Sequence, residues 1–520
     1  MLYGRALATA SSFLTAAALQ AQTTSEGTSA KSEPKTDSPA LRVLTRDANS
    51  STVEWTELLT NAVTGEVTQQ NHDYVTVGNG LNYRDESGAW RESQDLIELL
   101  PDGSAAALRG PNKVRFNPNL NTADAISVTT VSNRLFRTFV VGIYYFDAAT
   151  GQSALVATVQ DSIGELLPPN QILYRDAFKG LKADVRVTCT KSAYESDVIL
   201  LEKPLPPENF GLNPKSVRLE IWHEWLDAPA PNKQANALKA ETDPLLRETM
   251  VEPDLIDEAL VFGDLWLPLG KPFEWTSSAQ SGTNEPAQVR VVDPSTDANQ
   301  VLVAKRWLRL EDKDTGQRDL LIESVDWRDI EAQLDALPRM AMADQAVGKD
   351  QAALERSLPE RRLAKKSDRT MKVASLPYRA KGYVFDYIAV TGGTSYTFAS
   401  GVSYYISSSA SFSGTVTFQP SCVIKLASNG YLLLYGPIVC NGTLASPSIL
   451  TSKDDNLYGD TILSSTGNPV YAANPAMWIY YTAVPQDEWY LTKKSVGFQL
   501  VPCDRHGDEK ETPKPKANEM

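Results

Sequence analysis

Between residues 41 and 330, apolar and polar positions alternate over short stretches separated by turn residues. Val185, Val187 and Cys189 fall on one face of such a stretch, while polar residues occupy the positions between them. Residues 137–159 contain two apolar runs separated by the turn sequence DAATG. A period of two residues is typical of a strand with one buried face, and the intervening turn predicts a hairpin. The pattern therefore predicts a β-rich region of one or two sandwich-like units.

A second pattern begins near residue 375 and continues to about residue 500. Very short apolar runs alternate with tight turns every five to seven residues, and small residues are frequent. This texture predicts a short parallel β-helix, in which inward Val, Ile, Leu and Phe stack on those of the next coil. Another β-sandwich is the alternative. Residues 331–374 are rich in Ala, Leu and charge and predict a helical linker, and residues 501–520 form a polar tail.

The N-terminus has the pattern of an export signal. Arg5 precedes an uncharged run rich in Ala and Leu, and Ala21 offers a small residue for cleavage. We therefore expect residues 1–21 to be a signal peptide, residues 22–40 to be a disordered spacer, and the protein to be secreted or displayed at the cell surface. The apolar run is shorter than the roughly 20 residues of a membrane helix, so no transmembrane segment is expected after the signal is removed.

Composition narrows the function classes. The 520 residues carry 50 Lys and Arg against 64 Asp and Glu, a net charge of −14, which argues against nucleic acid as a partner. The basic run at residues 361–366 leaves attraction to an anionic polymer or membrane surface open. There are three histidines and four cysteines without CxxC spacing. For Cys422 and Cys440 we expect either a disulfide between them or two stacked, buried thiols.

Several phrases resemble one group of bacterial proteins. The run GTVTFQPSCVIKLASNGYLLLYGPIVCNGTLASPSILTSKDDN (residues 414–456) resembles the first coils of right-handed parallel β-helix domains in large exported multidomain proteins. The phrases GLNYRDESGAWRES (residues 80–93), YYFDAATGQS (residues 144–153) and LLIESVDW (residues 320–327) are similar to the N-terminal regions of those proteins, some of which carry Rhs-like repeats. The resemblance covers most of residues 50–480. It implies a bacterial β-helix protein, but that family is largely uncharacterised and supplies no catalytic motif.

Few coils precede the polar tail. This leaves open that the chain is a truncated product of a longer gene.

Catalytic motifs are scarce. His223 precedes Glu224, but the second histidine that a zinc-protease helix needs is replaced by Asp227, so a packed or edge histidine is favoured. No G-x-S-x-G elbow, phosphate-binding glycine loop or paired Cys/His cluster occurs. A pair of carboxylates acting on a glycosidic bond remains open, because such pairs are defined in space rather than in sequence.

Two acidic turns are calcium candidates. Asp312 and Asp314 lie in the sequence DKDTG, with Glu323 eleven residues after Asp312, but the glycine is one position early for a calcium loop and a polar hairpin turn is the better account. Asp454 and Asp455 directly follow a predicted β-helix strand, where hard oxygen ligands could hold calcium. A solvated turn is the favoured interpretation of Asp454 and Asp455.

Aromatic side chains in the predicted β-helix are candidates for sugar stacking. Tyr404, Tyr431 and Tyr435 combine an apolar ring face with a polar rim, as sugar-binding platforms do. The alternative is that these rings fill the core. We expect a non-catalytic, exported scaffold or adhesion protein whose partners are extracellular polysaccharide or cell-surface proteins. The alternative is a protein that binds or cleaves polysaccharide along the β-helix face.

Overall fold

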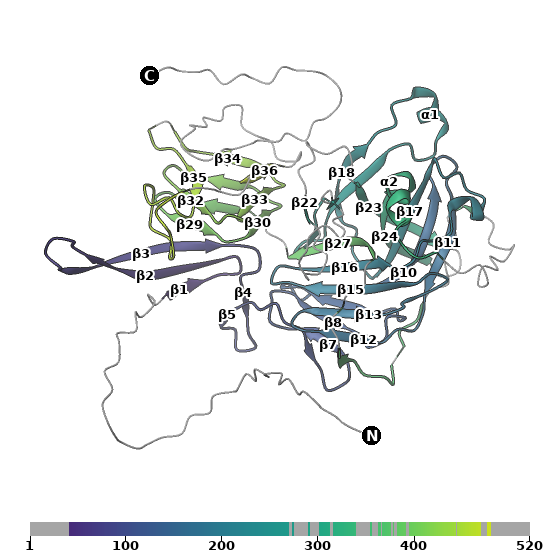
Figure 1. Cartoon of the computed structure of the whole chain (residues 1–520), viewed down its shortest axis with the longest axis horizontal. Coiled ribbons are helices and arrows are strands. Elements are labelled where there is room, and N and C mark those ends of the chain that lie inside the picture. The colour runs from purple at the N-terminus through teal and green to yellow at the C-terminus, as the bar shows by residue number, and fades with distance from the viewer. Residues whose placement is uncertain are drawn as a thin grey trace, which may run out of the picture. The chain divides into compact units, whose positions relative to one another are not determined.

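In the computed structural model, shown in Figure 1, Leu41–Met520 forms one unit separate from Met1–Ala40. The structure describes residues 41–479, except for 270–272, 275–289, 292–300, 313–315, 340–353, 356–361, 366, 376–377, 379–381, 392–394, 444 and 470–475. The predicted signal peptide, spacer and polar tail therefore lie outside the described residues. Among the described helices, none has both the length and the apolar character needed to cross a membrane.

The described chain is mostly β-structure, as expected from the alternating pattern. An eleven-stranded sheet contains the order β23-β24-β17-β10-β9-β8-β7-β6, with β11, β14 and β25 attached through β11 to β10. Its strands are β6 (Glu98–Leu99), β7 (Ala105–Ala107), β8 (Lys113–Phe116), β9 (Ile126–Thr129), β10 (Leu135–Asp147), β11 (Gln152–Val159), β14 (Phe178–Lys179), β17 (Val217–Leu226), β23 (Val303–Asp312), β24 (Gly316–Asp326) and β25 (Leu354–Glu355). Neighbours pair antiparallel, and β10 and β11 form the hairpin predicted around the DAATG turn.

A nine-stranded sheet runs in the order β18-β19-β20-β27-β16-β15-β13-β12-β26. Its strands are β12 (Gly164–Leu167), β13 (Gln171–Tyr174), β15 (Ala183–Cys189), β16 (Ala193–Leu200), β18 (Asn232–Lys239), β19 (Leu255–Val261), β20 (Leu265–Leu267), β26 (Lys372–Val373) and β27 (Tyr383–Thr391). One large cluster of buried apolar side chains draws on both this sheet and the eleven-stranded sheet. The two sheets therefore share a hydrophobic core, which burial of apolar surface stabilises.

Short helices border these sheets. They are the 3₁₀ helix η1 (Pro207–Phe210), α1 (Pro244–Thr249) and α2 (Trp327–Leu334). In α2, Trp327, Ile330 and Leu334 are buried at helical spacing, and the ring of Trp327 meets Tyr145 edge-on at 5.4 Å. The helix therefore begins ahead of the predicted linker, because Trp327 belongs to the core.

Residues 396–479 contain three stacks of short parallel strands, which we call the parallel-strand region. The stacks are β28 (Tyr396–Phe398), β31 (Val416–Phe418) and β34 (Ile438–Cys440); β29 (Ser403–Ile406), β32 (Val423–Leu426) and β35 (Ile449–Ser452); and β30 (Ser409–Phe412), β33 (Tyr431–Leu434) and β36 (Met477–Ile479). Phe398 stacks on Phe418 at 5.2 Å inside a separate apolar core. A Cβ atom on Gly430 would lie 2.2 Å from the carbonyl oxygen of Ile406, so this close approach of successive turns requires glycine.

The N-terminal strands join the parallel-strand region. They are β1 (Arg42–Arg46), β2 (Ser50–Thr60) and β3 (Val67–Val77), and β3 pairs parallel with β29. Conversely, β27 pairs with β16 and β20 in the nine-stranded sheet. Strand pairing thus crosses the predicted segment boundary near residue 375 in both directions. The short pairs β4 (Asn82–Arg84) with β5 (Trp90–Glu92) and β21 (Phe273–Glu274) with β22 (Arg290–Val291) complete the described strands.

Candidate functional site

In the acidic turn after β35, nearby groups of the chain donate hydrogen bonds to both aspartates. Asp455 is almost fully buried, and its carboxylate accepts hydrogen bonds from the Thr451 hydroxyl at 2.6 Å and the Leu457 N–H at 2.9 Å. Asp454 accepts from Lys453 Nζ at 3.1 Å and from the Thr466 N–H at 2.8 Å. Burial acts in the opposite direction, but these bonds hold the pKa of Asp454 below its usual value.

A lysine supplies a positive charge beside this turn. Lys425 on β32 is fully buried, and its Nζ donates to the carbonyl oxygens of Asp455 at 2.8 Å and Asp460 at 2.5 Å. Burial lowers the pKa of Lys425. An ammonium group held by carbonyl oxygens occupies the kind of position that a bound cation would take. Calcium binding by Asp454 and Asp455 stays a prediction. A calcium ion there would lie close to the positive charge of Lys425 and would be repelled by it.

The other calcium candidates are only partly covered by the structure. Asp314 lies outside the described residues. Asp312 is the last residue of β23 and pairs in register with Gly316, as the hairpin alternative expects, but its side chain is not described. Among the residues that are described, His, Cys, Asp and Glu form no group of three or more suited to a metal ion.

Two of the three candidate tyrosines are core residues in the structure. Tyr404 is 4% exposed, meets Phe398 edge-on at 5.0 Å and accepts a hydrogen bond from the Ala399 N–H. Tyr435 is 6% exposed and meets Trp266 edge-on at 4.5 Å. Tyr431 is half-buried and packs beside the same cluster. Neither Tyr404 nor Tyr435 presents an open ring face on which a sugar could stack.

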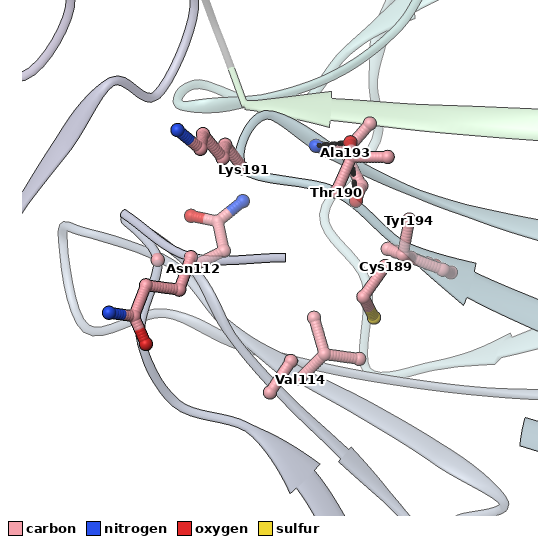
Figure 2. A pocket seen from close by; sticks show the side chains of 10 residues that line it. Asn112, Val114, Cys189, Thr190, Lys191, Ala193 and Tyr194 are labelled. Carbon is pink, nitrogen blue, oxygen red and sulfur yellow. Dashed lines mark hydrogen bonds between the residues drawn. The ribbon is translucent and has the colours of Figure 1, made fainter. Parts of the chain in front are cut away.

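A small hollow near the start of β16 contains a thiol. It has a volume of about 20 Å³, room for about one water, and its lining includes Asn112, Cys189, Lys191 and Tyr194 (Figure 2). Burial raises the pKa of Cys189 far above its usual value, and the Lys191 side chain points away from the sulfur. A protonated thiol is a poor nucleophile, so this hollow lacks the activated cysteine of a catalytic site.

Arg362, in the basic run of the predicted linker, is half-buried against β10. A β-bulge in β10 shifts the register between Val140 and Gly142. The Arg362 guanidinium donates to the Val140 oxygen at 2.7 Å and the Val141 oxygen at 2.9 Å. Burial lowers the pKa of Arg362 to about 10. Arg362 therefore serves the fold rather than an external polyanion.

Charged side chains lie buried on both faces of β17 and β24. On one face, Arg318 pairs with Glu224, and both are 1% exposed. On the same face, Glu220 accepts from Trp222 Nε1 at 2.8 Å and from the Ser324 hydroxyl at 3.2 Å. Because buried charges are costly unless paired, this face is a satisfied structural network rather than an open site.

The opposite face carries a second charged layer, which we call the inter-sheet cluster: His223, Asp257, Lys305 and Glu323. His223 Nε2 lies 3.3 Å from Glu323 Oε2, and both side chains are 1% exposed. Lys305 Nζ lies 3.0 Å from Asp257 Oδ1. Burial raises the pKa of Glu323, although His223 and Lys305 oppose this effect. His223, predicted to be a packed histidine, is thus in contact with Glu323, whose own protonated form is favoured by burial.

The sequence contains a signal for this cluster that no catalytic or metal-binding motif captures. Lys305 lies between Val303 and Trp307 on one strand face, and Glu323 lies between Leu321 and Val325. Asp257 similarly lies between Leu255 and Ala259. A charged side chain at an inward position of an alternating strand is costly to bury, so it requires an oppositely charged or hydrogen-bonding partner in the core. The pattern can therefore locate the three charged residues, but it cannot pair them.

The hairpin of β2 and β3 carries several exposed apolar side chains. Beyond Trp55 and His72, whose rings stack at 4.9 Å, both strands run together to a projecting tip (Figure 1). The exposed fraction is 63% for Leu58, 94% for Val63 and 56% for Val67. We call residues 56–71 the arm. A two-stranded ribbon with exposed apolar side chains is marginal in water, so it is suited to docking.

A scan against protein-family models and searches of curated proteins and of solved structures found no match to this chain. The resemblance to exported β-helix proteins therefore stays a prediction, and function has to be argued from the geometry itself.

Proposed function

We propose that this protein is a non-catalytic, exported scaffold or adhesion protein of bacterial origin. In this proposal the two large sheets form a sandwich-like body, and the parallel-strand region is a short right-handed β-helix. The shared core of the two sheets and the strand-on-strand parallel pairing support these assignments. The predicted export signal and the resemblance to exported proteins support an extracellular site of action. The arm is the observation that carries the function, because it presents apolar groups and strand edges to a partner.

The partner that the arm fits best is a second copy of this chain. Within the described residues, the outer edge of β3 pairs with β29 only at Val75 and Thr76. The preceding edge segment, Val67–Asn71, contains no charged residue and neither of the usual edge-blocking residues, Lys and Pro. An antiparallel pairing of this segment with itself is symmetric and opposes no like charges, although the whole chain carries a net charge of −14. The edge of β2 is less suited, because it carries Glu54 and Glu57.

A matched pair of lysine variants tests this proposal. Thr56 and Asn71 are direct cross-strand partners, and the Thr56 hydroxyl donates to Asn71 Oδ1 at 2.9 Å. Asn71→Lys and Thr56→Lys both remove this bond and add one charge to the arm, but only the first adds it to the β3 edge. We expect Asn71→Lys to weaken dimerisation of the full chain about tenfold or more, because a lysine on an edge strand opposes pairing with another chain. Thr56→Lys should leave dimerisation nearly unchanged.

Sedimentation equilibrium over a range of protein concentrations measures this association. A chain that stays monomeric at all concentrations, or that responds equally to both variants, contradicts assembly through β3. A glycan-array and depolymerisation screen of the same chain, with and without calcium, addresses the polysaccharide alternative. Depolymerisation of any polysaccharide would overturn the non-catalytic proposal.

A further inference from the structure

Lys305 and Asp257 join the two large sheets at a dry contact. Lys305 lies on β23 of the eleven-stranded sheet, and Asp257 lies on β19 of the nine-stranded sheet. Their side chains are 6% and 0% exposed, and Nζ lies 3.0 Å from Oδ1. The backbone N–H of Lys305 donates to the same oxygen at 3.0 Å. An amine and a carboxyl group are thus held in contact, away from water, by strands of different sheets.

We propose that the ion pair of Lys305 and Asp257 converts into an intramolecular amide bond between Nζ and Cγ. A proton first passes from the ammonium to the carboxylate, because two neutral groups are easier to bury than two charges. The neutral Nζ then attacks Cγ and forms the C–N bond. The C–O bond to the departing oxygen breaks, a second proton leaves the nitrogen, and one water is released. The reaction needs no oxidant, reductant or activated co-reactant.

The neighbouring groups suit each step of this condensation. The Lys305 N–H points at Oδ1, where negative charge develops when the carbonyl is attacked, so it acts as an oxyanion donor. Glu323 is the direct cross-strand partner of Lys305 and shares its strand face. Burial raises the pKa of Glu323 and so favours its protonated form, and we therefore assign to Glu323 the role of giving a proton to the departing oxygen. His223, 3.3 Å away, orients that carboxyl group.

Such a bond has a clear structural consequence. Cys189, Cys422 and Cys440 are free thiols in the structure, so no disulfide among them links the sheets. An amide between β19 and β23 would fasten the two sheets at their junction and constrain the unfolded chain, as a disulfide does. This inference concerns the body of the protein and does not depend on assembly through the arm.

Peptide mapping of the folded, purified full chain tests the bond directly. We expect a tryptic digest to contain a branched species in which the peptide of Asp257 is joined to the peptide of Lys305. Its mass should be lower than the sum of the two peptide masses by one water. Trypsin should not cleave after Lys305 in this species. Lys239 is the internal control, because its Nζ lies 2.6 Å from Asp326 Oδ2 but its side chain is 42% exposed. Its peptide should be cleaved normally. Complete cleavage after Lys305 in the folded wild-type protein would overturn the proposal.

Three variants separate the chemistry from simple packing. Asp257→Ala should abolish the branched species, whereas Asp257→Asn should still form it, with loss of ammonia in place of water. Glu323→Gln should slow bond formation after refolding about 100-fold or more, the usual contribution of a positioned proton donor. Glu258→Gln is the matched control, because Glu258 follows Asp257 on β19 and accepts a hydrogen bond from the Trp307 N–H of β23 at 2.7 Å. Equal rates for Glu323→Gln and Glu258→Gln would contradict the role of Glu323.

Discussion

Cys440 shows how a single side chain's surroundings set its chemistry. It ends β34 and is half-buried, and burial, together with the nearby Cys422, raises the pKa of its thiol to about 11. Cys422 is fully buried and is also a free thiol. In the structure both cysteines are therefore free thiols, and no disulfide joins them.

Alkylation of Cys440 should accordingly be slow. Because only the thiolate reacts, we expect iodoacetamide at pH 8 to modify Cys440 about 100-fold more slowly in the folded chain than in denaturant. Below the raised pKa, the rate should increase about tenfold per pH unit. Mass spectrometry of the Cys440 peptide measures both values. Equal rates in the folded and denatured chain, or a Cys422–Cys440 disulfide in the unreduced digest, would contradict this expectation.

At the scale of elements, side chains take the place of missing strands and ions in the parallel-strand region. The Asn79 amide donates to the Ser411 oxygen at 2.8 Å and accepts from the Ser411 N–H at 2.6 Å, as a neighbouring strand would. The edge of β30 is thereby satisfied without another strand. Lys425 acts in the same way on the segment after β35, where it binds two carbonyl oxygens.

Replacing Lys425 tests whether this lysine takes the place of a cation. Lys425→Met leaves two buried carbonyl groups without their donor, so we expect a loss of about 2–4 kcal/mol in the free energy of unfolding. Denaturant unfolding measures this change. EDTA should leave the melting temperature of the wild-type chain unchanged, because the positive charge belongs to the Lys425 side chain and cannot be removed by a chelator. Lys425→Arg serves as the control for charge alone and should lose less, and a wild-type chain destabilised by EDTA would favour the predicted calcium site.

At the scale of the whole molecule, segments that are distant in sequence complete each other's sheets. β27 fills the place between β16 and β20, and β3 pairs with β29. Trp55 Nε1 also donates to the Thr461 oxygen at 2.9 Å. Because these pairings cross the predicted boundary near residue 375, we expect folding of the body to depend on residues that follow it.

Two fragments test this dependence. A fragment of residues 41–374 lacks β27, so β20 and β16 each expose an unpaired edge, whereas residues 41–391 retain the strand. We expect the shorter fragment to unfold at a melting temperature lower by about 10 °C or more, or to aggregate through the open edges. Circular dichroism melting and light scattering compare the two. Equal stability of both fragments would show that β27 is dispensable for the body.

The sequence by itself determined which residues alternate as strands, and so the mostly β character and the hairpin of β10 and β11. Those features follow from local periodicity, which every strand carries within itself. Only the tertiary structure decided that Lys305 meets Asp257, that Lys425 lies beneath the acidic turn, and that Tyr404 and Tyr435 are core rings. Such pairings join residues far apart along the chain, and the geometry that selects them exists only once the sheets are assembled.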